Sequence, residues 1–236
     1  MGKAKRGKGM AASASSDDAD ILRAQAYGLI AHLLARPPSR DLLGTVGALA
    51  GDGSPLGLAI SDLAARARAR SGDPDGERRA GREYHELFIG VTRGELVPFA
   101  SYYRTGFLID RPLARLREDM QELGIERAPG VSEPEDHIAA IAEIMGALAA
   151  GTVGEEDGEA PDLPRQKRFF DRHLAPWAGR FFRDLEEAAA ADLYRPLGTF
   201  GRLFLDIETN AFAMIAHAGD GAVRGQDKRE GTIHAP

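Results

Sequence analysis

Apolar residues recur along most of this chain at intervals of three and four positions. This spacing places them on one face of an α-helix. The first such pattern follows Asp20 and ends at Arg36, because Pro37 and Pro38 cannot continue a helix. Its apolar face consists of Leu22, Ala26, Leu29, Ile30 and Leu33. The alternation typical of β-strands is almost absent, so the pattern predicts an all-α fold.

About nine helices are expected in all. The other eight cover approximately residues 42–49, 54–70, 75–89, 110–123, 132–150, 163–174, 176–190 and 192–216. Ser54 is expected to cap the third helix, with Pro55 at its first position. The sixth should begin with a capping box, in which the Ser132 side chain and the Glu135 side chain satisfy each other's backbone N–H groups.

Residues 90–107 interrupt the helical pattern with three glycines, a proline and a cluster of aromatic residues. The aromatic side chains are Phe99, Tyr102, Tyr103 and Phe107. Loops usually lie on the surface of a protein, so large apolar groups there must either turn inward or bind a partner.

The chain is expected to form one all-helical domain over residues 20–216. A disordered basic tail at 1–19 and a flexible tail at 217–236 would flank it. An acidic, glycine-containing loop at 151–162 should be mobile.

No apolar run approaches the ~18–20 residues that a membrane-spanning helix requires. The basic N-terminus is followed by Ala, Ser and Asp rather than by the apolar segment of a secretory signal.

The composition is that of an ordinary globular protein, with 43% hydrophobic and 28% charged residues. The net charge is −6, and four positive charges within the first ten residues leave −10 for the remainder. An acidic body disfavours nucleic-acid binding and suits a cationic partner. The chain has no cysteine, which excludes disulfides and thiolate chemistry and fits the reducing cytoplasm.

The sequence contains no zinc-protease, P-loop, nucleophile-elbow or dinucleotide-binding motif, so no cofactor is expected. Its densest polar cluster is Glu133-Pro134-Glu135-Asp136-His137. Three interpretations are open: carboxylates that stabilise a helix N-terminus, a metal site of Glu133, Asp136 and His137, or a site that recognises a cationic ligand. The metal-site interpretation would make the protein a helical metal-dependent enzyme.

Two groups of aromatic residues have different expected roles. The residues of the first occur at helical spacing and should belong to the core: Phe169, Phe170, Trp177, Phe181 and Phe182. The second group could line a groove for an apolar peptide: Tyr84, Leu87, Phe88, Pro98 and Phe99.

Three segments resemble the TorD/DmsD/NarJ family of redox-enzyme maturation chaperones. Residues 83–90 (EYHELFIG) and 97–103 (VPFASYY) resemble its Y-x-x-L-F-x-G … P-Y/F-x-S-x-Y block. Residues 133–138 (EPEDHI) resemble its E-P-x-D-H-I/L motif. Residues 169–177 (FFDRHLAPW), followed by Phe181, resemble its F-x-x-x-H-L-x-P-W block. One such segment is a weak signal, but three in family order are specific.

The resemblance implies a non-catalytic cytoplasmic chaperone. Members bind the twin-arginine signal peptide of molybdopterin-containing oxidoreductases, delay export and assist cofactor insertion. A formate dehydrogenase or a sulfoxide or amine-oxide reductase would be a fitting client, and the chaperone would be a monomer or a domain-swapped dimer. The signal-peptide-binding residues carried over are Tyr84, Leu87, Phe88, Pro98, Phe99, Glu133, Pro134, Asp136 and His137.

The chemistry of the ligand agrees with this expectation. A twin-arginine leader carries two adjacent guanidinium groups ahead of an apolar run, so its receptor needs carboxylates beside an apolar surface. Glu133 and Asp136 can supply the charge. The apolar groove can be supplied by Tyr84, Leu87, Phe88 and Phe99. The prediction therefore requires the first two motif segments to be neighbours in the fold.

Overall fold

Ten α-helices and one π-helix make up the part of the chain that the structure describes. A computed structural model describes residues 8–91, 93–127, 130, 133–153 and 162–226. The α-helices are α1 (Lys8–Ala35), α2 (Arg40–Gly47), α3 (Pro55–Ser71), α4 (Gly76–Tyr84), α5 (Ala100–Thr105), α6 (Arg111–Glu122), α7 (Ile138–Ala149), α8 (Leu163–His173), α9 (Ala178–Glu187) and α10 (Tyr194–Gln226). The described residues contain no β-strand, which confirms the all-α prediction.

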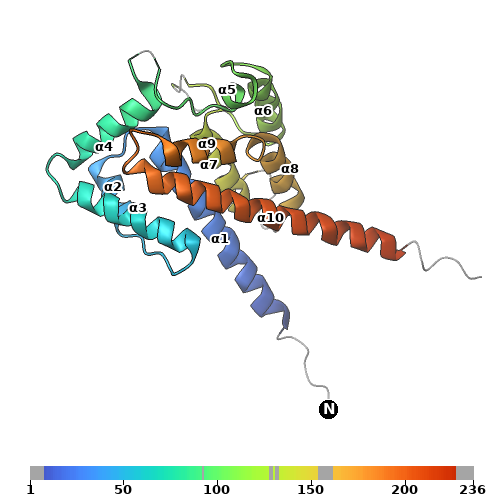
Figure 1. The fold of residues 1–236 in the computed structure, drawn as a ribbon. Coiled ribbons are helices and arrows are strands. Elements are labelled where there is room, and N and C mark those ends of the chain that lie inside the picture. The colour runs from blue at the N-terminus through green and yellow to red at the C-terminus, as the bar shows by residue number, and fades with distance from the viewer. Residues whose placement is uncertain (1–7, 92, 128–129, 131–132, 154–161, 227–236) are drawn as a thin grey trace, which may run out of the picture.

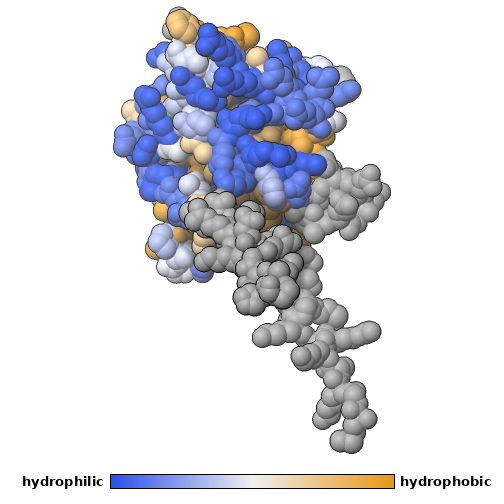
Figure 2. All heavy atoms as spheres, turned by 90° about the vertical axis from the view of Figure 1, so that its right-hand side faces the viewer, coloured by the Kyte–Doolittle hydropathy of each residue, from blue (hydrophilic) through white to orange (hydrophobic). Residues whose placement is uncertain are grey.

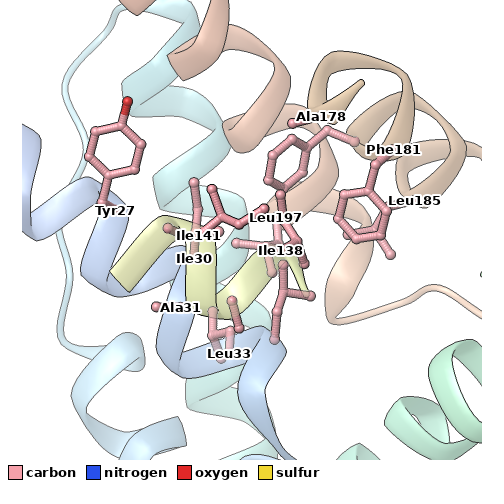
Figure 3. Packing of buried hydrophobic residues seen from close by; sticks show 14 of the residues in the cluster. Tyr27, Ile30, Ala31, Leu33, Ile138, Ile141, Ala178, Phe181, Leu185 and Leu197 are labelled. Carbon is pink, nitrogen blue, oxygen red and sulfur yellow. The ribbon is translucent and has the colours of Figure 1, made fainter. Parts of the chain in front are cut away.

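The core lies between α1, α7, α9 and α10. Helix α1 packs along α7, and α10 packs along α9 and α3. Figure 3 shows Ile30 and Leu33 of α1 close to Ile138 and Ile141 of α7. The core also takes in the aromatic residues predicted for it: Phe169, Phe170, Trp177, Phe181 and Phe182 are all buried.

The two longest helices extend outward from this core. In Figure 1, α1 and α10 leave the helical body in different directions. They also extend past the domain limits expected at residues 20 and 216, since α1 begins at Lys8 and α10 ends at Gln226. Residues 1–7 and 227–236, the outer parts of the two predicted tails, lie outside the described residues. So does 154–161, most of the predicted mobile loop.

Three expectations about local structure are corrected. The predicted helix at 75–89 is α4 followed by a π-helix, His85–Ile89. The predicted loop at 90–107 contains the short helix α5. The predicted capping box is wrong: α7 begins at Ile138, His137 is its N-cap, and Glu135 forms ion pairs instead. Ser132 lies outside the described residues.

The surface is mainly polar. The face drawn in Figure 2 is mostly hydrophilic, with hydrophobic residues in separate patches. No helix among the described residues is both long enough and apolar enough to cross a membrane.

Candidate functional site

The first and second motif segments meet in space. The backbone N–H of Ile138 donates to the carbonyl of Pro98 at 2.9 Å, and the N–H of Ala100 donates to the carbonyl of Asp136 at 2.9 Å. Between these bonds Phe99 and His137 form an isolated antiparallel bridge. We call the region formed by residues 84–88, 98–101 and 133–138 the motif junction.

Asp136 fastens the junction from inside. Its side chain is only 1% exposed, and its Oδ2 accepts a hydrogen bond from the backbone N–H of Ser101 at 2.8 Å. Asp136 therefore satisfies the first backbone donors of α5, whose own N-cap residue makes no side-chain hydrogen bond. Oδ1 is buried and has no hydrogen-bond partner among the described residues.

His137 is a buried helix cap. Its Nδ1 accepts from the backbone N–H of Ala139 at 3.2 Å, so the proton of the neutral ring is assigned to Nε2. Burial lowers the pKa of His137 to about 4, which keeps the ring neutral near pH 7. The ring of Phe99 lies edge-on to it, with 4.9 Å between the centroids.

Tyr84 and Phe88 join the junction to the core. Tyr84 donates to the carbonyl of Leu34 at 3.1 Å, and its ring centroid lies 5.0 Å from that of Phe88. Phe88 in turn lies 5.4 Å from Tyr194 of α10. Burial, together with the nearby negative charge of Glu133, raises the pKa of Tyr84 to about 12.

Burial divides the nine predicted binding residues into two groups. Five are buried and serve to build the junction: Tyr84, Leu87, Pro98, Asp136 and His137. The other four are accessible from outside: Phe88, Phe99, Glu133 and Pro134. Only the second group can touch a ligand in this conformation.

The third motif segment packs against α5 through its buried aromatic residues. Trp177 is 2% exposed and donates from Nε1 to the carbonyl of His173 at 2.6 Å. Tyr103 of α5 packs against Trp177 at 5.4 Å between centroids and against Phe181 at 5.8 Å. The Tyr103 hydroxyl donates to Asp184 at 2.9 Å.

Glu135 belongs to the junction but is absent from the binding residues predicted from the sequence. It lines a pocket beside the junction and binds Arg117, whose Nη2 lies 2.8 Å from its Oε2. Its place three residues after Ser132 fits a capping box, so the sequence predicted that Glu135 stabilises the start of its own helix. The cluster of acidic residues at 133–136 indicates a possible binding site for a cation. The sequence does not show which of these carboxylates face outward.

The arrangement does not favour a metal centre. Asp136 and His137 each have an oxygen or nitrogen committed to a backbone N–H. Among the described residues, no three histidine or carboxylate side chains gather as metal ligands would.

Comparisons with known proteins identify the fold and the family. The structure is similar to that of a redox enzyme maturation protein from Archaeoglobus fulgidus, with a TM-score of 0.52 and 22% identity. The similarity covers 78% of this chain and 94% of the other. The model of the family described as "Nitrate reductase delta subunit" matches residues 50–183, more than half of the chain. The chain belongs to this family, which confirms the predicted TorD/DmsD/NarJ relationship.

Curated relatives are named as chaperones rather than as enzymes. "Chaperone protein TorD" of Aliivibrio fischeri is 28% identical over 131 residues, covering 53% of this chain and 60% of the relative. The protein of the same name in Vibrio cholerae is 25% identical over 134 residues, covering 56% and 61%. The chain thus spans about 60% of the length of these relatives.

Proposed function

We propose that this protein is a cytoplasmic chaperone that binds the twin-arginine signal peptide of a molybdoenzyme precursor. By holding the peptide, it would delay export while the cofactor is inserted and the enzyme matures. The observation that carries this proposal is the motif junction, where backbone hydrogen bonds join the segment that bears the exposed Glu133 to the segment that bears the partly exposed Phe99. A formate dehydrogenase or a sulfoxide or amine-oxide reductase is the proposed kind of client.

The accessible residues of the junction suit such a peptide. Phe88 and Phe99 offer apolar surface for the hydrophobic run, and Glu133 offers a carboxylate for a guanidinium group. The Glu133 side chain has no ion pair within the described residues, so a ligand need not displace a partner from it. The buried residues Asp136 and His137 hold the turn that presents Glu133.

Calorimetric titration with synthetic leaders from molybdoenzymes of the same genome tests this proposal. We expect saturable binding to one leader, and a large loss of affinity when its two arginines are changed to alanine. Glu133→Gln should weaken binding by about tenfold, since it removes a hydrogen bond to a charged group. Phe99→Ala should weaken it by a similar factor of about ten through lost apolar contact.

Matched variants outside the junction control for charge and hydrophobicity. Glu187→Gln removes an exposed carboxylate from α9, and Phe107→Ala removes a ring that is 72% exposed in the α5–α6 loop. Both should bind the leader as the unaltered protein does. Failure of the folded protein to bind any leader, or equal losses in the control variants, would count against the proposal.

A further inference from the structure

A small pocket lies beside the motif junction, between α6, the turn that follows it and the 133–137 segment. It is lined by Arg117, Met120, Gln121, Gly124, Ile125, Glu126, Arg127 and Glu135. Its volume is about 240 Å³, below the ~300–1,000 Å³ typical of small-molecule sites. The pocket is therefore of a size for one side chain rather than for a whole metabolite.

The lining has the two components that an arginine side chain requires. Met120 and Ile125 are apolar and can contact the methylene stem, while Glu126 and Glu135 carry carboxylates for the guanidinium group. Glu135 is the more enclosed of the two, with a side chain 11% exposed.

The chain's own arginines already occupy this carboxylate. Arg117 donates to Oε2 of Glu135 from Nε at 3.1 Å and from Nη2 at 2.8 Å. Arg127 approaches the other oxygen, with Nη1 3.9 Å from Oε1. Burial tends to raise the pKa of Glu135, but the hydrogen bonds from Arg117 and the charges of both arginines lower it overall. Glu135 is thus a carboxylate that faces two guanidinium groups at once.

Both arginines can leave without disturbing the core. Their side chains are 51% and 36% exposed, so each can return to water. Water competes for the exposed guanidinium groups in these pairs, and an incoming guanidinium group would restore the same interaction at the enclosed Glu135.

The pocket is continuous with the junction. Arg127 also donates from Nη2 to the carbonyl of Glu133 at 2.9 Å. Glu135 directly precedes Asp136, whose backbone and side chain are bonded to Ala100 and Ser101. The pocket and the junction therefore share the segment that carries Glu133 and Glu135.

We propose that one arginine of the leader enters this pocket and replaces Arg117 and Arg127 at Glu135. The two internal arginines are competitors of the leader, and they restrict tight binding to peptides that supply a guanidinium group in return. This inference rests on the proposed leader-binding function and assigns the specificity of that site to Glu135, Arg117 and Arg127.

The experiment compares two double variants by calorimetric titration with the twin-arginine leader and its Ala-Ala counterpart. The first is Arg117→Ala with Arg127→Ala. The control is Arg111→Ala with Arg115→Ala, which removes two exposed α6 arginines that have no side-chain ion pair among the described residues. Thermal unfolding checks that each variant is folded. The single variants Arg127→Ala and Arg115→Ala provide the same comparison with a smaller risk of misfolding.

We expect the first variant to bind the twin-arginine leader about three- to tenfold more tightly than the unaltered protein. The control should gain less than about twofold from the general change in charge. Neither should gain affinity for the Ala-Ala leader, and Glu135→Gln should remove most of the preference for the twin-arginine form.

Equal gains in the two double variants, equal gains for the two leaders, or no gain at all would overturn the competitor role while leaving the proposed function intact. Absence of binding by the unaltered protein would instead overturn the proposed function, and this inference with it.

Discussion

At the scale of single residues, neighbouring polar side chains in the Glu133–His137 segment have opposite roles. Asp136 points inward to the backbone of α5, and His137 caps α7. Glu133 stays exposed, and Glu135 meets Arg117 at the pocket. The buried members set the shape of the turn, and this shape determines where the two outer carboxylates stand.

The burial of His137 predicts a pH dependence of stability. Its folded pKa of about 4 lies below the ~6.5 of an unfolded histidine, so the unfolded chain binds the proton more readily. The contribution of the neutral His137 ring to the free energy of unfolding is fully present above about pH 6.5. It is lost as the pH falls toward 4, by up to about 3 kcal/mol.

Urea unfolding between pH 4 and pH 7 measures this loss. His137→Asn is the matched variant, because asparagine can still cap the helix but does not titrate. The difference in stability between the two proteins should change across this interval. A constant difference would show that His137 does not carry the proton linkage.

At the scale of elements, close helix contacts and one irregular helix determine the geometry around the site. The π-helix is followed by Gly90, whose φ of 64° and close approach to Arg93 exclude a side chain. π-Helices are rare and are frequent at functional sites. Helices α9 and α10 touch through Gly198, where a Cβ atom would lie 2.6 Å from the backbone nitrogen of Glu186.

The same substitution should have opposite effects at two helix glycines. Gly198→Ala forces α9 and α10 apart and should destabilise the protein by about 1–3 kcal/mol. Gly44→Ala in α2, where nothing lies within 4 Å of the new Cβ, should stabilise it by about 0.5–1 kcal/mol. Thermal unfolding of both variants checks the signs. A destabilised Gly44→Ala together with a neutral Gly198→Ala would contradict the described packing.

At the scale of the whole molecule, a largely buried ionic cluster joins α1 and α10, the first and last helices. Arg23 of α1 donates to both carboxylate oxygens of Glu208 in α10, at 2.7 Å and 2.8 Å. Tyr27 donates to Glu208 at 2.7 Å, and Arg23 also reaches Gln166 of α8 at 2.9 Å. Burial, with the charge of Glu208, raises the pKa of Tyr27. The cluster fixes α1, α8 and α10 near the points where the two long helices leave the body.

Glu208→Gln should therefore destabilise the protein by about 2–3 kcal/mol, since it leaves the partly buried Arg23 without its main anionic partner. Asp171→Asn removes the more exposed pair with Lys167 on α8 and should cost about 1 kcal/mol or less. Urea unfolding measures both. Similar losses in the two variants would mean that the cluster adds no more than a surface ion pair.

The sequence by itself determined the helical class, most helix positions, the aromatic core around Phe181 and the family relationship. These features depend on local periodicity and on residue order, which the chain carries without its fold. The tertiary structure decided where α5 and α7 begin, because the donors of α5 are satisfied by Asp136, 35 positions away. It also decided which carboxylates face outward, since neighbouring acidic residues look alike in sequence. Their burial depends on the partners that packing brings to them.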